Sequence, residues 1–193
     1  VVPLPSRPLP ALEMATAALA ECAPGRVAVG LGAGHRETAA SQFGWPGSST
    51  PAAVGEAIVS LREALRSATL HHRGASGEPL VLQLRGQHVQ TPPELFVGAL
   101  RDRMVTVAAQ NADGMLLNWV TERRAARLCE VAAARRTDRQ FTTAAYVPVC
   151  VVDGATAREE AYREVAGQLS SYLQLSAYGD LLSDDGYAED VEA

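Results

Sequence analysis

Glycines at alternate positions are the first feature of this sequence that could form a binding or catalytic site. Gly30, Gly32 and Gly34 close an apolar run, and His35 and Arg36 follow at once. Glycines spaced in this way let another molecule approach the backbone closely, because no side chain stands between them. A neighbouring imidazole and guanidinium could hydrogen-bond a ligand oxygen or pair with a phosphate. The stretch is therefore a candidate ligand site, and a tight strand-to-helix turn without a ligand is the alternative.

The spacing of these glycines disfavours a dinucleotide site. That fingerprint needs glycines at its first, third and sixth positions. Counted from Gly30, the sixth residue is His35, and counted from Gly32 it is Glu37. The acidic partner expected about twenty residues further along the chain is also missing, because Pro51 and alanines stand there.

Composition limits the classes of protein to which the chain can belong. Its 193 residues are 47% hydrophobic and 20% charged, which is typical of one soluble globular domain. The net charge of −5, with 17 basic residues that are all arginine, disfavours a nucleic-acid partner. No apolar run approaches the roughly 18 residues of a membrane span, and no signal peptide is evident. We expect a cytoplasmic protein without a membrane partner.

The cysteines and the paired histidines give no sign of a metal site. Cys22, Cys129 and Cys150 lack a Cys-x-x-Cys spacing, so we expect reduced and mostly buried thiols. His71 and His72 are adjacent and do not point to one common ligand, so we expect both on the surface.

Short apolar runs alternate with helical patterns along the chain. The runs predict strands at 27–31, 95–99, 114–118 and 143–151, and the segment 71–93 is expected to be irregular or a short hairpin. Helical patterns fill 11–22, 49–70, 101–114, 122–136 and 154–175. Thr50 and Thr121 are the expected N-caps of two of these helices. The alternation predicts one domain with a parallel sheet of about five strands and helices on both faces.

Three segments together resemble a known family. Luciferase-like oxidoreductases, above all the branch that uses the deazaflavin coenzyme F420, have a fourth strand and loop similar to "GRVAVGLGAGHRETAASQFGWP". Their fifth strand, helix and sixth strand resemble "ELFVGALRDRMVTVAAQNADGMLLNWVTE", and the end of their third strand resembles "VVPLPSRPLP". The segments cover most of residues 1–152 in the family's order. The resemblance implies an α/β fold, the (β/α)8 TIM barrel.

The implied barrel is incomplete, because residues 1–193 would supply only strands three to seven of a single domain. A barrel closes its hydrogen bonding only with all its strands, so an arc of five leaves bare edges. We expect either a segment of a longer protein or a shortened barrel whose edges pair with another subunit. A homodimer is the expected assembly.

The resemblance also implies where a cofactor would lie: across the carboxyl ends of the strands, with its phosphate tail near strands four and five. The residues implied to bind it are Gly34, His35, Arg36, Gly98, Ala99, Leu100 and Leu116. Those implied to shape the substrate pocket are Phe43, Trp45, Asn118 and Trp119. His35 is the candidate catalytic residue, and no metal is implied.

One position departs from the family. Relatives often carry Gly-Pro after strand five, where this chain has Arg101 and Asp102. Asp102 is expected to be the N-cap of the next helix, and its carboxylate would compete with a phosphate for the same amides. Arg101 and Arg103 could offset that charge.

The implied activity is hydride transfer between coenzyme F420 and a small organic substrate. In such enzymes the cofactor carries the chemistry and the protein supplies positioning and electrostatics. Two alternatives stay open: an FMN-dependent monooxygenase on the same fold, and a cofactor-free barrel relative with a binding or structural role.

Overall fold

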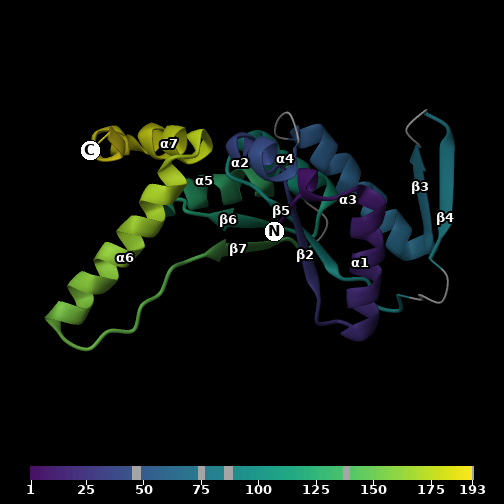
Figure 1. Ribbon diagram of the computed structural model, residues 1–193, viewed down its shortest axis with the longest axis horizontal. Coiled ribbons are helices and arrows are strands. Elements are labelled where there is room, and N and C mark those ends of the chain that lie inside the picture. Colours follow the sequence, from purple (N-terminus) through teal and green to yellow (C-terminus); the bar gives the residue numbers. More distant parts are fainter. Residues whose placement is uncertain (45–48, 74–76, 85–88, 137–139, 193) are drawn as a thin grey trace.

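A five-stranded parallel sheet lies at the centre of the computed structural model (Figure 1). The structure describes residues 1–44, 49–73, 77–84, 89–136 and 140–192. In spatial order the strands are β1 (Val2–Pro3), β2 (Ala28–Gly32), β5 (Glu94–Gly98), β6 (Gly114–Asn118) and β7 (Thr142–Tyr146). The predicted strands at 27–31, 95–99 and 114–118 are confirmed, as parallel neighbours.

The helices identify the sheet as an arc of a barrel. Four crossover helices contact one another in chain order: α1 (Leu9–Cys22), α3 (Pro51–Ser67), α4 (Asp102–Asn111) and α5 (Glu122–Ala133). The strands of the sheet also follow one another in chain order. In a doubly wound sheet, by contrast, the strand order reverses at one point and helices cover both faces. The expectation of helices on both faces was therefore wrong. Alternating strand and helix patterns suit both topologies, and strand order is what separates them.

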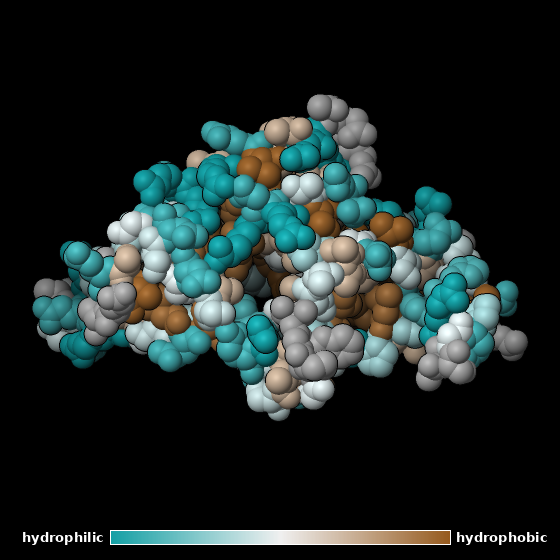
Figure 2. Space-filling model, turned by 90° about the horizontal axis from the view of Figure 1, so that it is seen from above, coloured by the Kyte–Doolittle hydropathy of each residue, from teal (hydrophilic) through white to brown (hydrophobic). Residues whose placement is uncertain are grey.

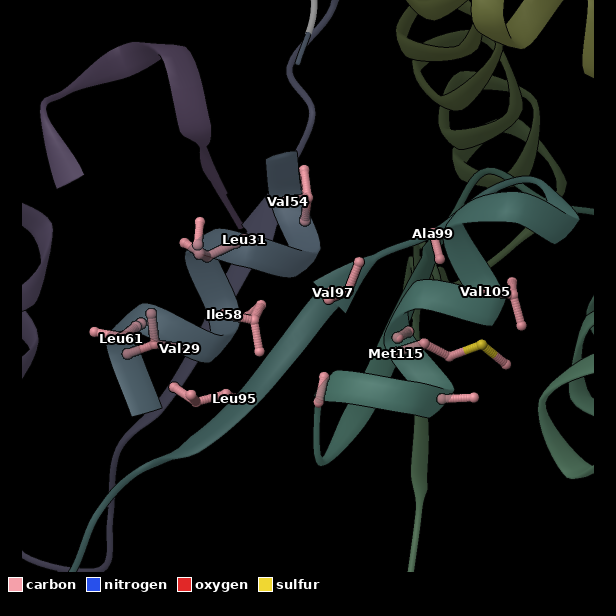
Figure 3. Close-up of a cluster of buried hydrophobic side chains, with 14 of the residues drawn as sticks. Val29, Leu31, Val54, Ile58, Leu61, Leu95, Val97, Ala99, Val105 and Met115 are labelled. Atoms are coloured by element: carbon pink, nitrogen blue, oxygen red, sulfur yellow. The ribbon is translucent and has the colours of Figure 1, made fainter. Parts of the chain in front are cut away.

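The hydrophobic core lies between the sheet and this helix layer. Val29 and Leu31 of β2 and Leu95 and Val97 of β5 face Ile58 and its neighbours on α3 (Figure 3). These side chains are buried, and burying each one contributes roughly 1.5–3 kcal/mol to stability. Alternate residues of the same strands point to the opposite, inner face of the sheet, which the described helices of this layer leave open.

Strand β7 is shorter than its sequence suggested. The run predicted as a strand over 143–151 leaves the sheet at Tyr146. Pro148 has no N–H to offer a ladder. Val149 and Val151 are 82% and 98% exposed. High β-propensity alone did not extend the strand, because no further described strand pairs with β7 on its outer side.

A small antiparallel hairpin stands apart from the main sheet. It consists of β3 (Thr69–Arg73) and β4 (Pro79–Gln83), so the hairpin alternative for this region is confirmed. His71 is exposed as expected, but the surface prediction for His72 was wrong. The His72 Nε2 atom lies 2.6 Å from Oε2 of Glu13, which is fully buried and also accepts a 2.8 Å hydrogen bond from Ser60. This buried carboxylate links the hairpin to the helix layer.

The C-terminal part of the chain is helical. It contains α6 (Ala155–Leu173), α7 (Ser176–Leu182), a π-helical turn (Ser183–Tyr187) and α8 (Ala188–Glu192). In Figure 1, α6 runs beside the extended chain that follows β7, and α7 returns to the upper end of the molecule, near α2 (Arg36–Phe43). A 3-10 turn, Leu4–Ser6, completes the described elements.

Two further expectations concern the surface. All three cysteines are free and exposed, so the prediction of buried thiols was wrong: Cys22 ends α1, Cys129 lies on the exposed side of α5, and Cys150 follows β7. No helix among the described residues combines the length and the apolar character that crossing a membrane requires.

Candidate functional site

The parallel strands bring the candidate residues to one edge of the sheet. Leu31 of β2 is level with Val97 of β5, and Gly98 is level with Leu116 of β6. The carboxyl ends of these strands therefore meet, and the segments that leave them carry Gly34, Leu100 and Asn118. This is the common end that the sequence predicted, and it is the end at which parallel α/β folds place their ligands.

Three glycines on the inner face of the sheet leave a space that the Val1 side chain occupies. A Cβ atom added to Gly30, Gly32 or Gly98 would lie 3.2, 2.9 or 3.2 Å from a methyl group of Val1. The three residues thus face one shared space, here named the glycine cradle, and Leu116 borders it through its pairing with Gly98. Seen from above, apolar residues surround a hollow in the middle of the molecule (Figure 2).

Gly34 has a different reason to be glycine. Its φ of +76° lies in the left-handed region, and a Cβ there would stand 3.4 Å from both Pro3 and Pro5. The left-handed turn geometry disfavours a side chain there, whereas the distances to Pro3 and Pro5 are those of ordinary van der Waals contact. The alternate glycines of the opening stretch therefore serve two structural purposes, a bare sheet face and a tight turn.

His35 stands at the rim of the cradle, just before α2. Its carbonyl accepts hydrogen bonds from Ala39 N (2.8 Å) and Thr38 Oγ1 (3.2 Å), which fix the backbone at this position. Burial lowers the pKa of the half-buried ring, and the Glu37 carboxylate raises it to a smaller extent. A neutral imidazole of this kind can accept a hydrogen bond or a proton.

Aromatic side chains from the C-terminal helices cover this edge. The rings of Tyr172 and Tyr178, here named the aromatic roof, meet edge to face at 5.0 Å. Tyr178 also lies 5.5 Å from the His35 ring and accepts a 2.8 Å hydrogen bond from Asn118 Nδ2. Trp119 packs against Tyr172 at 5.7 Å and has a φ of +48°, which is rare for an aromatic residue.

Polar contacts fix α7 over the strand ends. Ser176 donates from its hydroxyl and its N–H to Glu37 Oε1, at 2.7 and 3.2 Å. At the other end, Asp185 and Arg124 form a buried ion pair with Nη2–Oδ1 of 2.6 Å, and Thr121 donates to Asp185 at 2.7 Å. The hydrogen bonds from Arg124 are the main reason that the pKa of Asp185 is lowered.

The turn after β5 differs from its prediction. The N-cap of α4 is Arg101, and Asp102 is the first helical residue, with its carboxylate paired to Arg127 of α5. The N-cap prediction for Asp102 was therefore wrong, because an arginine on the next helix holds that carboxylate. Arg101 in turn lies 3.6 Å from both Asp180 and Asp184.

The remaining predicted residues are not all gathered at the rim. Arg36 and Phe43 are exposed on α2. Ala99 is fully buried in the core and donates its N–H to Leu116 O at 3.0 Å. Leu100 is half-buried beside the rim. Trp45 lies outside the described residues.

Sequence reasoning missed the roof and its anchor. No element was predicted for residues 176–182, yet Leu181 is fully buried and Tyr178 is 3% exposed. The short run "AYGDLL" of small and apolar residues, just before the acidic end of the sequence, was the available signal. Its partners lie more than fifty residues away along the chain, so no local pattern identifies them.

Comparisons with known proteins give a family from one search and a similar fold from another. All of residues 1–193 match the family model described as luciferase-like monooxygenase. A search of curated proteins finds no match. A solved structure with a similar fold is that of an F420-dependent secondary alcohol dehydrogenase in complex with an F420–acetone adduct. Its sequence is 17% identical, with a TM-score of 0.53 over 71% of this chain and 44% of that one, so this chain spans less than half of that chain's length.

Proposed function

Because the chain belongs to the luciferase-like monooxygenase family, we propose that it is an oxidoreductase that transfers hydride between coenzyme F420 and a small organic substrate. The five-stranded sheet is part of a luciferase-like (β/α)8 barrel. One observation carries the proposal: the glycine cradle lies at the carboxyl end of this sheet, with His35 and Asn118 at its rim. The similarity to an F420-dependent dehydrogenase supports the choice of a deazaflavin.

The residues of the cradle suit a flat ring system. Gly30, Gly32 and Gly98 present backbone alone, and the side chain that lies over them, Val1, is itself 52% exposed. Leu116 offers an apolar surface beside them. When bound, the deazaflavin ring supplies the site that gives or takes the hydride. The protein's part is to hold that ring against the glycine backbone, in the space that Val1 occupies here, and to place the substrate over it.

His35 is the proposed proton carrier. Hydride removal from an alcohol leaves a hydroxyl proton that a base must take. The His35 ring is neutral at physiological pH because burial lowers its pKa, so a ring nitrogen has a lone pair available. The same ring returns the proton in the reverse direction. Asn118 is the proposed hydrogen-bond acceptor for the substrate hydroxyl in the binding complex, and the same proton passes to His35 in the hydride step.

The residues around Arg101 suit a cofactor phosphate less well than the glycine cradle suits the ring. A phosphate tail near this turn would need the guanidinium, which Asp180 and Asp184 already flank. These pairs are long and exposed, so each contributes roughly 0–1 kcal/mol and an anion can replace them. The acidic neighbours favour the alternative of a cofactor-free relative, whereas the family's description as monooxygenases favours the FMN-dependent alternative.

Ligand titration distinguishes the proposed F420-dependent oxidoreductase from the FMN-dependent and the cofactor-free alternatives. Purified protein is titrated with F420, FMN and NADPH, and binding is followed by calorimetry. We expect F420 to bind most tightly. Gly98→Ala should weaken F420 binding about tenfold, since the new methyl group enters the cradle.

The matched control is Gly167→Ala on α6, where a Cβ meets nothing within 4 Å and affinity should not change. Tighter binding of FMN than of F420 would support the monooxygenase instead. Binding of neither would support the cofactor-free relative, and equal affinities of the two glycine variants would place the ligand elsewhere.

A further inference from the structure

Tyr178 is a polar residue in an unusual place. It comes from α7, yet its side chain lies among residues of two strand ends, and only 3% of the residue is exposed. Tyr172 and His35 contact its ring, at centroid distances of 5.0 and 5.5 Å. A phenylalanine would make the same ring contacts, so the hydroxyl needs a separate explanation.

The hydroxyl holds the side-chain amide of Asn118. Asn118 Nδ2 donates to the Tyr178 oxygen at 2.8 Å. Asn118 follows Leu116 by two residues on β6, so both lie on the inner face of the sheet, together with Gly98. The amide nitrogen therefore points toward the roof.

The other end of that amide is open. Among the described residues no donor reaches Asn118 Oδ1, and this oxygen is not fully buried. An amide has two donors and an acceptor at opposite positions. Fixing the nitrogen on Tyr178 thus leaves the carbonyl oxygen as the group that a ligand meets.

We propose that Tyr178 is a positioning residue that orients Asn118 so that its Oδ1 accepts a hydrogen bond from a hydroxyl-bearing substrate. This inference rests on the proposed function, whose substrate class it narrows to alcohols. A carbonyl compound has only acceptors and would meet the Asn118 oxygen unfavourably. The site then recognises the reduced form of the substrate through Asn118.

Two further observations fit this role. Burial raises the pKa of Tyr178, so its hydroxyl stays protonated at neutral pH and remains a neutral acceptor for Asn118. The residue after Asn118, Trp119, holds a left-handed backbone conformation and packs on Tyr172 of the same roof. Backbone outliers of this kind persist where the surrounding structure fixes them, and they cluster at functional sites.

The sequence allows a direct test, because it contains two asparagines, Asn111 and Asn118. Protein labelled with ¹⁵N at asparagine gives two pairs of side-chain amide signals in an NMR spectrum. Tyr178→Phe should shift the Asn118 pair and leave Asn111, which donates to Val107 O on α4, unchanged. Tyr172→Phe is the matched control, and it should leave both pairs in place. An unmoved Asn118 pair in Tyr178→Phe would overturn the proposal.

Small probes test what Asn118 accepts. Titration of the labelled wild-type protein with 2-propanol should shift the Asn118 signals in a saturable way, and acetone, which has no donor, should not. Tyr178→Phe should weaken the 2-propanol response about fivefold, because the amide is free to rotate. A response to acetone alone, or to neither probe, would overturn the proposal. None of these readouts needs a bound cofactor, so they stand apart from the F420 and FMN titrations that test the proposed function.

Discussion

At the scale of single residues, His35 links the site to the pH dependence of folding. Burial holds its pKa below the ordinary value of about 6.5, so the folded protein binds a proton less readily than the unfolded chain. Below that pH the unfolded state gains protons first, and stability should fall as the pH falls.

We therefore expect His35→Gln to reduce this loss of stability, measured by urea unfolding at about pH 7.5 and about pH 5.5. His71→Gln, at an exposed position, is the control and should behave as the wild type does. An unchanged pH dependence in His35→Gln would mean that the ring is not buried in solution.

Gly114 is a residue at which the addition of one methyl group should strongly destabilise the fold. A Cβ at this position would collide with the Phe96 ring and with the carbonyl oxygen of Thr142 on β7. Both neighbours belong to the sheet, so relief requires the strands to move. We expect Gly114→Ala to lower the free energy of unfolding by at least about 1–3 kcal/mol.

The opposite result is expected for Gly167→Ala. This glycine lies inside α6 with free space around it, and alanine there should stabilise the protein by roughly 0.5–1 kcal/mol. Chemical denaturation of both variants measures the contrast. Equal stabilities would show that β6 and β7 do not pack as described.

At the scale of elements, the position of α7 depends on one buried ion pair. Asp185 and Arg124 are 8% and 6% exposed, and the removal of one partner leaves the other charge buried. Asp185→Asn should therefore cost about 3 kcal/mol, and hydrogen exchange should show faster opening of α7. The low pKa of Asp185 means that its contribution is present above about pH 4 and is lost as the pH falls further.

Asp184→Asn is the matched control for this prediction. Asp184 makes a long, exposed pair with Arg101, so its neutralisation should change stability by less than about 1 kcal/mol. If both variants open α7 equally, the helix is held by its apolar contacts alone.

Elements whose signals are local were predictable from the sequence. Thr50 and Thr121 accept hydrogen bonds from Ala53 N and Arg124 N, as N-caps do, because a cap depends on residues three positions apart. The buried strands were equally clear from their apolar runs. The end of β7 was not, because its length depends on whether a neighbouring strand is present to pair with it.

Only part of the candidate site could be predicted from the sequence. The glycines, His35 and Asn118 stand at strand ends, and parallel pairing brings such ends together whatever the details. Tyr178, the partner of Asn118, lies sixty residues further along the chain. His72 was expected on the surface because its partner, Glu13, is likewise distant in sequence. Contacts of this range are decided by packing and leave no periodic trace.

At the scale of the whole molecule, no described strand covers either edge of the sheet. β1 and β7 are its outer strands, and Val147, Val149 and Val151 beyond β7 are 70%, 82% and 98% exposed. Unpaired strand edges and exposed apolar residues favour association. We propose that this chain, studied alone, forms a dimer or a larger assembly through this region.

Light scattering measures the assembly directly. Val149→Asp should shift the protein toward the monomer, because a charge in the contact opposes burial. Val59→Asp is the control, since Val59 is 53% exposed on α3, away from the edge. A monodisperse wild-type monomer would contradict the proposal.

The position of α7 in the chain also sets an order of events during synthesis. Ser176 meets Glu37 across 139 positions, and Asp185 meets Arg124 across 61. Such distant contacts close late. Every strand of the sheet leaves the ribosome before α7 does, so His35 and Asn118 of the nascent protein are not yet covered by the aromatic roof. A ligand present during translation meets uncovered strand ends, whereas a ligand that arrives after α7 has folded meets the aromatic roof already in place.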